Sequence, residues 1–239
     1  MSKADKEEVP QLDFKVLIDQ IRQRLECMVL FADDEPEDTP VLQRTYQMAE
    51  GAVPVMVVGG INASGKSILS SVIGTVAKTC GYTRRTVSMN NRTASGFERA
   101  MIFGDESDSS TGVNSVSAVI NGIKSSMTND TPAVLILDEP DIGLSEEYSG
   151  ALGEYIAQNV MQPDHNLKLV VVISHSRPLF RRLLKAIPFE PHTVFLGDKN
   201  KNFMDWLLQP VGHFGPEEIE LLKTRGRETW RAINRAIQD

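Results

Sequence analysis

The feature that most constrains this 239-residue chain is the segment Gly60-Ile-Asn-Ala-Ser-Gly-Lys-Ser67, which fits the pattern G-x-x-x-x-G-K-[ST] in full. It follows an apolar run, Val53–Val58, that predicts a buried strand, and it opens a predicted helix over Lys66–Cys80. In that setting the glycines let backbone N–H groups turn toward phosphate oxygens, and the helix N-terminus adds positive charge. The segment therefore predicts a nucleotide-phosphate site; the alternative is an ordinary Gly/Ser turn before a helix.

The residue types of this segment suit both phosphate and metal. Lys66 is expected to reach the β- and γ-phosphates, and Ser67 to bind Mg²⁺. The predicted cofactors are accordingly ATP and Mg²⁺. The residues expected to bind the nucleotide are, in chain order, Gly60, Asn62, Ala63, Ser64, Gly65, Lys66 and Ser67.

A second apolar run, Ala133–Leu137, ends in Asp138-Glu139-Pro140. An acidic residue at the carboxyl end of a central strand, beside a phosphate loop, can hold the water shell of a metal ion. Asp138 is therefore predicted to bind the metal together with Ser67. Glu139 is predicted to orient or deprotonate the attacking water. Each carboxylate taken alone also fits a helix cap or a solvated turn.

Strand-like and helix-like patterns alternate along the chain. Leu167–Ile173 predicts a third buried strand, and Ser174-His-Ser-Arg-Pro178 and a helix follow it. Continuous apolar strands between helices predict an α/β fold with a mostly parallel sheet covered on both faces. The remaining expected elements are helices over 14–30, 115–127, 146–160 and 179–185 and from 216 onward, strands over 84–87 and 193–196, an acidic linker over 33–40 and a loop over 103–114.

Composition excludes several classes of protein. The apolar runs are far shorter than the roughly 20 residues of a membrane helix, and the first residues lack the apolar core of a secretory signal. The two cysteines, Cys27 and Cys80, do not form a metal-binding or disulfide pattern. These features predict a cytoplasmic protein with no membrane partner. The net charge of −7 leaves only local basic faces for binding nucleic acid.

The order of the motifs resembles that of the ABC-type ATPases, over about residues 50–200. The phosphate loop and Asp138-Glu-Pro140 match two elements of that family, Asp141-Ile-Gly-Leu144 resembles its D-loop, and Ile173-Ser-His-Ser176 resembles its switch-histidine segment. Ser109-Ser-Thr-Gly-Val113 resembles its signature loop in keeping Ser110 and Gly112. The resemblance is to the soluble, non-transporter branch, the heads of RecF-like, OLD-like and SMC-like proteins.

The sequence also departs from the family pattern. The signature-like segment lacks the leucine, first glycine and glutamine, so a flexible Ser/Gly loop is the alternative. No glutamine lies between Lys66 and Asp138, which leaves Asn90 or Asn91 as substitutes for the glutamine loop, and Tyr46 is the candidate for stacking on adenine. The interval from Lys66 to Asp138 is shorter than in transporter ATPases, which predicts a reduced helical lobe.

The resemblance implies a mechanism and a division of the chain. His175 is expected to contact the γ-phosphate and to position Glu139 and water, so that Glu139, His175 and Lys66 form the catalytic set; a lone histidine is otherwise often just a partly buried polar residue. Two heads are expected to close on ATP, with Ser110 and Gly112 acting across the interface of a homodimer. The predicted parts are an N-terminal helix and acidic linker (1–49), the nucleotide-binding domain (50–200) and a C-terminal helical extension (201–239).

Two clusters of basic residues are candidates for binding DNA or a protein partner. One face of the predicted C-terminal helix carries Lys223, Arg227, Arg231 and Arg235. The other cluster follows the switch histidine and comprises Arg177, Arg181, Arg182 and Lys185. A solvated helix face is the alternative for both clusters.

The sequence leaves more than one function open. The leading prediction is an ATPase that dimerises on ATP and regulates a partner or a nucleic-acid substrate. The alternative is a nucleotide-gated scaffold with little turnover, which the incomplete signature and the missing glutamine favour. The ATPase component of a transporter and a small-molecule kinase fit the motifs less well.

Overall fold

The computed structural model describes residues 53–88, 110–128, 130–162, 166–197, 201–210, 212 and 215–238. These residues form a five-stranded sheet in the order β2-β3-β4-β1-β5, and every pair of neighbours is parallel. The predicted α/β architecture with a parallel sheet is confirmed. The strands are β1 (Val55–Gly60), β2 (Thr83–Ser88), β3 (Ala133–Asp138), β4 (Leu167–Ser174) and β5 (His192–Leu196).

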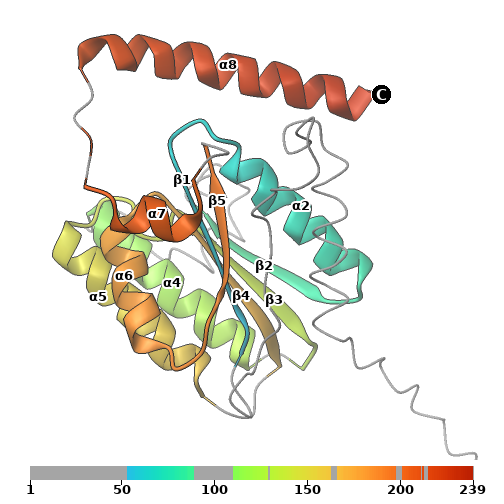
Figure 1. The fold of residues 1–239 in the computed structure, drawn as a ribbon. Coiled ribbons are helices and arrows are strands. Elements are labelled where there is room, and N and C mark those ends of the chain that lie inside the picture. Colours follow the sequence, from blue (N-terminus) through green and yellow to red (C-terminus); the bar gives the residue numbers. More distant parts are fainter. Residues whose placement is uncertain are drawn as a thin grey trace, which may run out of the picture.

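Helices cover both faces of this sheet (Figure 1). Helix α2 (Lys66–Thr79) lies on one face, and α4 (Thr111–Met127), α5 (Glu146–Val160) and α6 (Arg177–Ala186) lie on the other. Two further helices follow the last strand: α7 (Phe203–Leu208) and α8 (Pro216–Gln238). Since a parallel strand needs a crossover to return, the helices up to α6 serve to connect one strand to the next.

The strands are apolar on both faces because each face has its own core. In β1, Val55 and Val57 point into the core shared with α4, α5 and α6, whereas Met56 and Val58 point into the core shared with α2. All four side chains are buried. Period-two alternation of apolar and polar residues is therefore absent from this central strand.

Helix α4 begins earlier than the sequence predicts. The sequence predicts a loop over residues 103–114, but Thr111 to Asn114 belong to the helix; residues 103–109 lie outside the described part. The expectation was wrong because Gly112 and Asn114 are buried despite their loop-forming types. Packing against the loop after β3 outweighs the low helix propensity of glycine and asparagine.

Helix α7, which the sequence analysis did not predict, completes an aromatic cluster on the edge of the sheet. The ring centroids of Phe180 and Phe203 lie 5.2 Å apart, and those of Phe195 and Trp206 lie 5.7 Å apart. A Cβ atom on Gly59 would stand 2.5 Å from the Trp206 ring. The strand that leads into the phosphate loop therefore packs directly against α7, although α7 falls within the segment assigned to the C-terminal extension.

The arginines of α6 hold α7 in place. Arg177 Nη1 donates to the Gln209 carbonyl at 3.0 Å, and the guanidinium stacks on Trp206 at 5.4 Å from the ring centroid. Arg181 Nη2 donates to the Leu207 carbonyl at 2.8 Å, while Arg182 pairs with Glu154 of α5 at 3.8 Å. Within this predicted basic cluster, three arginines thus have partners in their own chain.

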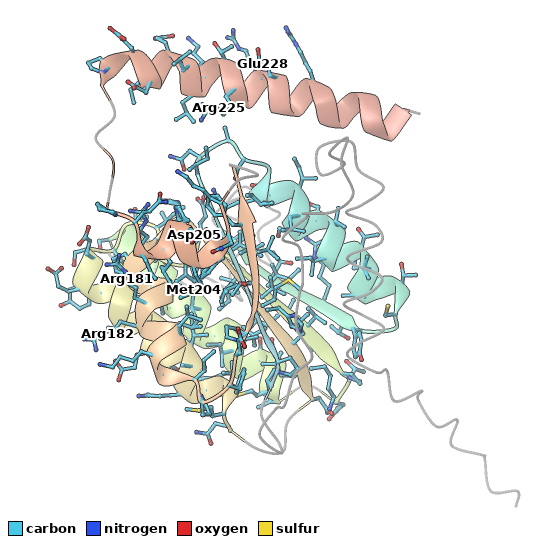
Figure 2. The ribbon with its side chains drawn as sticks, in the orientation of Figure 1. Arg181, Arg182, Met204, Asp205, Arg225 and Glu228 are labelled. Atoms are coloured by element: carbon cyan, nitrogen blue, oxygen red, sulfur yellow. The ribbon has the colours of Figure 1, made fainter. Side chains whose placement is uncertain are left out.

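The size of this aromatic cluster leads to a prediction about stability. Replacing Trp206 by alanine should lower the free energy of unfolding by about 3–5 kcal/mol, because it removes a 6% exposed indole from the core. Urea unfolding measures the change. Met204, which belongs to the same helix, is 45% exposed and is labelled in Figure 2, provides the control, since Met204→Ala should change stability by less than about 0.5 kcal/mol. Equal losses for the two variants would contradict the packing described.

Helix α8 passes over the phosphate loop (Figure 1). A Cβ atom on Gly226 would lie 3.7 Å from the Cβ atom of Ala63. Leu222 is partly buried, whereas Ile219 is 65% exposed. Of the predicted basic face, Lys223, Arg227 and Arg231 are exposed. Among the described residues, no helix is both long enough and apolar enough to cross a bilayer.

Candidate functional site

The predicted site lies at the carboxyl edge of the sheet, where β1, β3 and β4 end. Strand β4 lies between the other two: Gly59 of β1 is opposite Ser174, and Asp138 of β3 is opposite Ile173. The phosphate loop, the acidic pair and His175 therefore meet at one edge, although at least one helix separates each of them from the next in sequence. Ligands of open parallel sheets bind at this edge.

The phosphate loop has a backbone that few residue types adopt. Ala63 and Gly65 have positive φ angles of 61° and 94°, and α2 begins directly afterwards at Lys66. Strain of this kind in a non-glycine residue accumulates at functional sites. A Cβ atom on Gly60 would lie only 2.5 Å from the Leu196 carbonyl oxygen, so no larger residue fits there. The loop is thus a fixed turn that feeds the helix N-terminus.

Two side chains in this loop place buried polar atoms beside its backbone. The Oγ atom of Ser64 is buried and has no hydrogen-bond partner among the described residues. Lys66 is 6% exposed, and its Nζ donates to the carbonyl of Ile61 at 2.9 Å and to that of Gly60 at 3.4 Å. Burial lowers the pKa of Lys66, while Glu139 and Asp138 act in the opposite direction. Asn62 and Ser67 are exposed at the mouth of the loop.

Asp138 is a buried carboxylate whose negative charge is not fully stabilised by nearby positive charges and hydrogen bonds. Burial, and then repulsion from Glu139, raise its pKa to about 6, although Lys66 and a hydrogen bond with Ser70 act against the rise. A divalent cation would supply the missing positive charge, and carboxylate and hydroxyl oxygens are the ligands that Mg²⁺ prefers. Asp138 and Ser67 therefore fit the metal that the sequence predicts.

The raised pKa has a measurable consequence for stability. Between pH 3.8 and about 6 the folded protein holds a proton on Asp138 that the unfolded chain has lost, so this carboxyl lowers stability as the pH rises through that interval. Asp138→Asn should therefore raise the free energy of unfolding by about 1–3 kcal/mol at pH 8, without nucleotide or metal, and bring little or no gain at pH 4. Thermal unfolding at both pH values measures the difference. Asp130→Asn, at an exposed position, is the control, and a gain that does not depend on pH would contradict the assignment.

Glu139 and His175 face each other across the ends of β3 and β4. The Oε1 atom of Glu139 lies 3.5 Å from Nδ1 of His175. Glu139 has a positive φ of 52°, and its N–H donates to the Ile173 carbonyl at 2.8 Å. The hydrogen bond to His175 lowers the pKa of Glu139, and the same bond raises the pKa of His175. Near neutral pH the pair thus consists of a carboxylate held by an imidazole that readily protonates.

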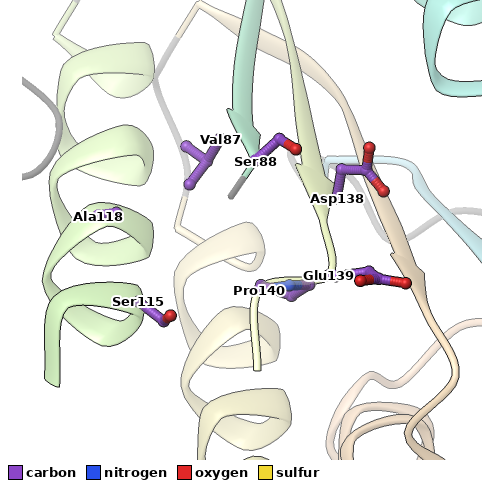
Figure 3. Close-up of a pocket in the computed structure, with 7 residues that line it drawn as sticks. All are labelled: Val87, Ser88, Ser115, Ala118, Asp138, Glu139 and Pro140. Carbon is purple, nitrogen blue, oxygen red and sulfur yellow. The ribbon is translucent and has the colours of Figure 1, made fainter. Parts of the chain in front are cut away.

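A small pocket opens next to this pair, between α4 and the ends of β2 and β3 (Figure 3). Ser115 and Ala118 of α4 face Val87 and Ser88 across it, and Asp138, Glu139 and Pro140 close it. The pocket therefore lies on the α4 side of the acidic pair. Residues 89–109, which follow β2, lie outside the described residues, and with them the glutamine-loop candidates Asn90 and Asn91. Tyr46, the candidate for stacking on adenine, also lies outside them.

The signature-like residues lie at the start of α4. Ser110 is the exposed N-cap of this helix. A Cβ atom on Gly112 would stand 2.5 Å from the Gly143 carbonyl oxygen, and Ser115 Oγ donates to the Ile142 carbonyl at 2.9 Å. Within the chain, Gly112 thus permits the close packing of α4 on the loop after β3, while Ser110 faces solvent.

Three residues of the site were not predicted from the sequence. Ser70 is a polar residue, 3% exposed, on the inner face of α2, whose other positions are mostly apolar. A serine at such a position is the sequence signal that could have identified it. Asp141 binds Ser174 and Ser149 through its two carboxylate oxygens. Asp141 lies in the segment that resembles the D-loop, but that resemblance assigns no function to this residue. No local sequence pattern indicates that Ser149 belongs to the site.

No protein-family model matches the chain, and no curated protein matches it. Among solved structures, the chain aligns with the Aeropyrum pernix ORC1 protein, determined in complex with DNA, at 11% sequence identity and a TM-score of 0.37. The alignment covers 93% of this chain and 52% of the other, so this chain spans about half the length of that structure. A similarity of this size carries no inference about activity.

Proposed function

We propose that the protein binds ATP with Mg²⁺ and hydrolyses it. The observation that carries the proposal is the convergence of Lys66, Asp138, Glu139 and His175 at the edge where β1, β3 and β4 end. These groups lie close enough to influence one another: burial lowers the pKa of Lys66 and the two carboxylates oppose that fall, while burial raises the pKa of Asp138 and Lys66 opposes that rise. A cation, a metal-type carboxylate and a base with its histidine are the parts that phosphoryl transfer to water needs.

Each residue has a role in this proposal. Lys66 exchanges the carbonyls of Ile61 and Gly60 for phosphate oxygens, so its charge is already inside the loop when the nucleotide arrives. Asp138 and Ser67 hold the Mg²⁺, which when bound neutralises phosphate charge. Glu139 accepts the proton of the attacking water. His175 fixes the orientation of the Glu139 carboxylate through the 3.5 Å contact.

The finer proposal is an ABC-type head that works as an ATP-dependent homodimer and regulates a partner or a nucleic-acid substrate. It is supported by the order of the motifs and by the exposure of Ser110 at the N-terminus of α4. Phosphoryl transfer needs donors on the γ-phosphate beyond the phosphate-loop lysine. In this proposal Ser110 and Gly112 of a second copy supply them, and the exposed basic side chains of α8 are the candidate contact for DNA or a protein.

A nucleotide-gated scaffold is the second candidate. It is favoured by the signature-like segment, which keeps only Ser110 and Gly112 of the family pattern, and by the absence of glutamine between Lys66 and Asp138. Such a protein would bind ATP through the same phosphate loop and release phosphate slowly. Glu139 and His175 would then serve assembly rather than turnover.

Steady-state phosphate release, with and without double-stranded DNA, separates the two candidates. An ATPase should show turnover that requires Mg²⁺ and saturates with ATP. Turnover at the background rate under both conditions, together with ATP binding in equilibrium dialysis, would favour the scaffold. A rate that rises with DNA and falls back on charge reversal of Lys223 and Arg227 would support a nucleic-acid substrate at α8.

A further inference from the structure

A network of serine hydroxyls joins the loop after β3 to the segment that carries His175. Both oxygens of one carboxylate accept hydrogen bonds: Asp141 Oδ1 accepts from Ser174 Oγ at 2.8 Å, and Asp141 Oδ2 accepts from Ser149 Oγ at 2.7 Å. Ser174 ends β4 and Ser149 lies in the first turns of α5. Three separate elements thus meet on Asp141.

The number of protons fixes the direction of the remaining bonds. A serine hydroxyl carries a single proton, and Ser149 uses its own on Asp141. In the 2.6 Å contact between Ser149 Oγ and Ser176 Oγ, Ser176 is therefore the donor. The backbone N–H of Ser176 donates to Ser174 Oγ at 2.9 Å. Both routes from Asp141 consequently end on Ser176, and His175 lies between two residues that the network anchors.

Two of the four side chains in the network are buried, and those of Asp141 and Ser176 are partly exposed. Ser174 is fully buried and Ser149 is 3% exposed. Hydrogen bonds in such surroundings are strong, and a buried hydroxyl that loses its partner is costly. The helix after His175 is tied in as well, because Ser176 Oγ accepts from the Leu179 N–H as the N-cap of α6. The position of His175 is therefore fixed from both sides.

We propose that Asp141 is a positioning residue for the Glu139–His175 pair. Its carboxylate holds the loop that carries Glu139 and the segment that carries His175 at the separation at which the two side chains meet. The inference rests on the proposed function, since ATP hydrolysis is the reaction that the pair would serve. A displacement of about 1 Å in such a pair costs on the order of 100-fold in rate.

The test uses two variants of the full chain. In Asp141→Asn the amide offers one acceptor oxygen, so one serine hydroxyl loses its acceptor and faces an N–H donor instead. Ser149→Ala breaks one route and keeps the charge of Asp141. Both variants should lower kcat for ATP by about 10- to 100-fold and leave the Kd for ATP within about threefold. Ser145→Ala is the matched control, because Ser145 is exposed and donates only to Glu147 among the described hydrogen bonds.

A second readout does not depend on turnover. The chain has four histidines, so the imidazole signals of His175 can be assigned by NMR with a His175→Ala variant. Its pKa is raised chiefly by the bond to Glu139, and burial opposes that rise; the charges of Glu139 and Asp141 raise it further, and the charge of Lys66 lowers it. In Ser149→Ala, which removes no charge, the pKa of His175 should fall because the Glu139 contact loosens.

The outcomes distinguish this inference from the proposed function. An unchanged His175 titration in both variants, or turnover equal to that of Ser145→Ala, would overturn the role of Asp141. If the wild-type protein hydrolyses no ATP, the proposed function fails by itself, and the His175 titration still decides whether Asp141 holds the pair. A lowered pKa in Ser149→Ala supports the network in either case.

Discussion

Glu139→Gln is expected to reduce ATP hydrolysis by about 10²–10⁴-fold while ATP binding persists. Glutamine has the shape of glutamate and can adopt the same backbone conformation, but its amide does not accept the proton of the attacking water. Lys66 and the phosphate loop stay intact, so nucleotide should accumulate on the protein. If a second copy closes on bound ATP, this variant should also elute as a dimer with Mg²⁺-ATP and as a monomer without it.

Phosphate release and light scattering after size exclusion measure these two effects. Glu146→Gln is the matched control, because Glu146 follows the same loop but is exposed at the first turn of α5. That variant should hydrolyse ATP at the wild-type rate. Wild-type turnover in Glu139→Gln would remove Glu139 from the mechanism. If turnover is lost but no dimer forms, the role of Glu139 in hydrolysis is supported and the homodimer is contradicted.

Lys66→Ala is expected to abolish ATP binding at concentrations that saturate the wild-type protein. The lysine is the cation inside the phosphate loop, and a charge-assisted hydrogen bond contributes about 1.5–3 kcal/mol. Losing contacts to two phosphates should therefore raise the Kd for ATP by about 10²–10⁴-fold. Removal of the ammonium also takes away a positive charge that acts on Asp138 and Glu139, which further disfavours an anionic ligand.

Isothermal titration with Mg²⁺-ATP measures the loss. Lys78→Ala serves as the control, since Lys78 is exposed in the last turn of the same helix and should bind ATP normally. Circular dichroism verifies that both variants fold. A Kd for Lys66→Ala within tenfold of the wild-type value would place the nucleotide somewhere other than the Gly60–Ser67 loop.

The parts of the fold that could be predicted are those whose signal is local. The strands β1, β3 and β4 are largely apolar because both of their faces are buried, apart from the exposed Lys168 near the start of β4. The phosphate loop is set by residue types that its backbone requires. These segments agree with the predicted ranges to within two residues. Parallel pairing of such strands then places their carboxyl ends, and with them Lys66, Asp138 and His175, at one edge.

The parts that could not be predicted depend on contacts between distant segments. Helix α4 starts at Thr111 because Gly112 packs on Gly143, which no property of residues 110–114 indicates. Helix α7 has a local capping box at Asn202 and Asp205, but its apolar face is fixed by an aromatic cluster that draws on the distant α6 and β5. The hydroxyl network of Asp141 likewise joins residues from three elements, so only the folded chain brings its members together.

The basic cluster of α6 illustrates the same limit. Charge alone made Arg177 and Arg181 candidates for binding a partner, yet their guanidinium groups donate to the carbonyls of Gln209 and Leu207. Those carbonyls belong to the end of α7 and the residue after it, which have no helical partners of their own. The basic side chains of α8 at positions 223, 227 and 231 are exposed instead, so α8 is the surface to vary first in DNA-binding experiments.

A structure of the Glu139→Gln variant with ATP and Mg²⁺ tests the central claim most directly. The account predicts that the phosphates lie in the Gly60–Ser67 loop with the γ-phosphate on Lys66 and that Ser67 and Asp138 hold the metal ion. It also predicts a water molecule between the substituted amide side chain at position 139 and the γ-phosphate. ATP bound elsewhere on the chain, or a metal ion away from Asp138, would contradict it.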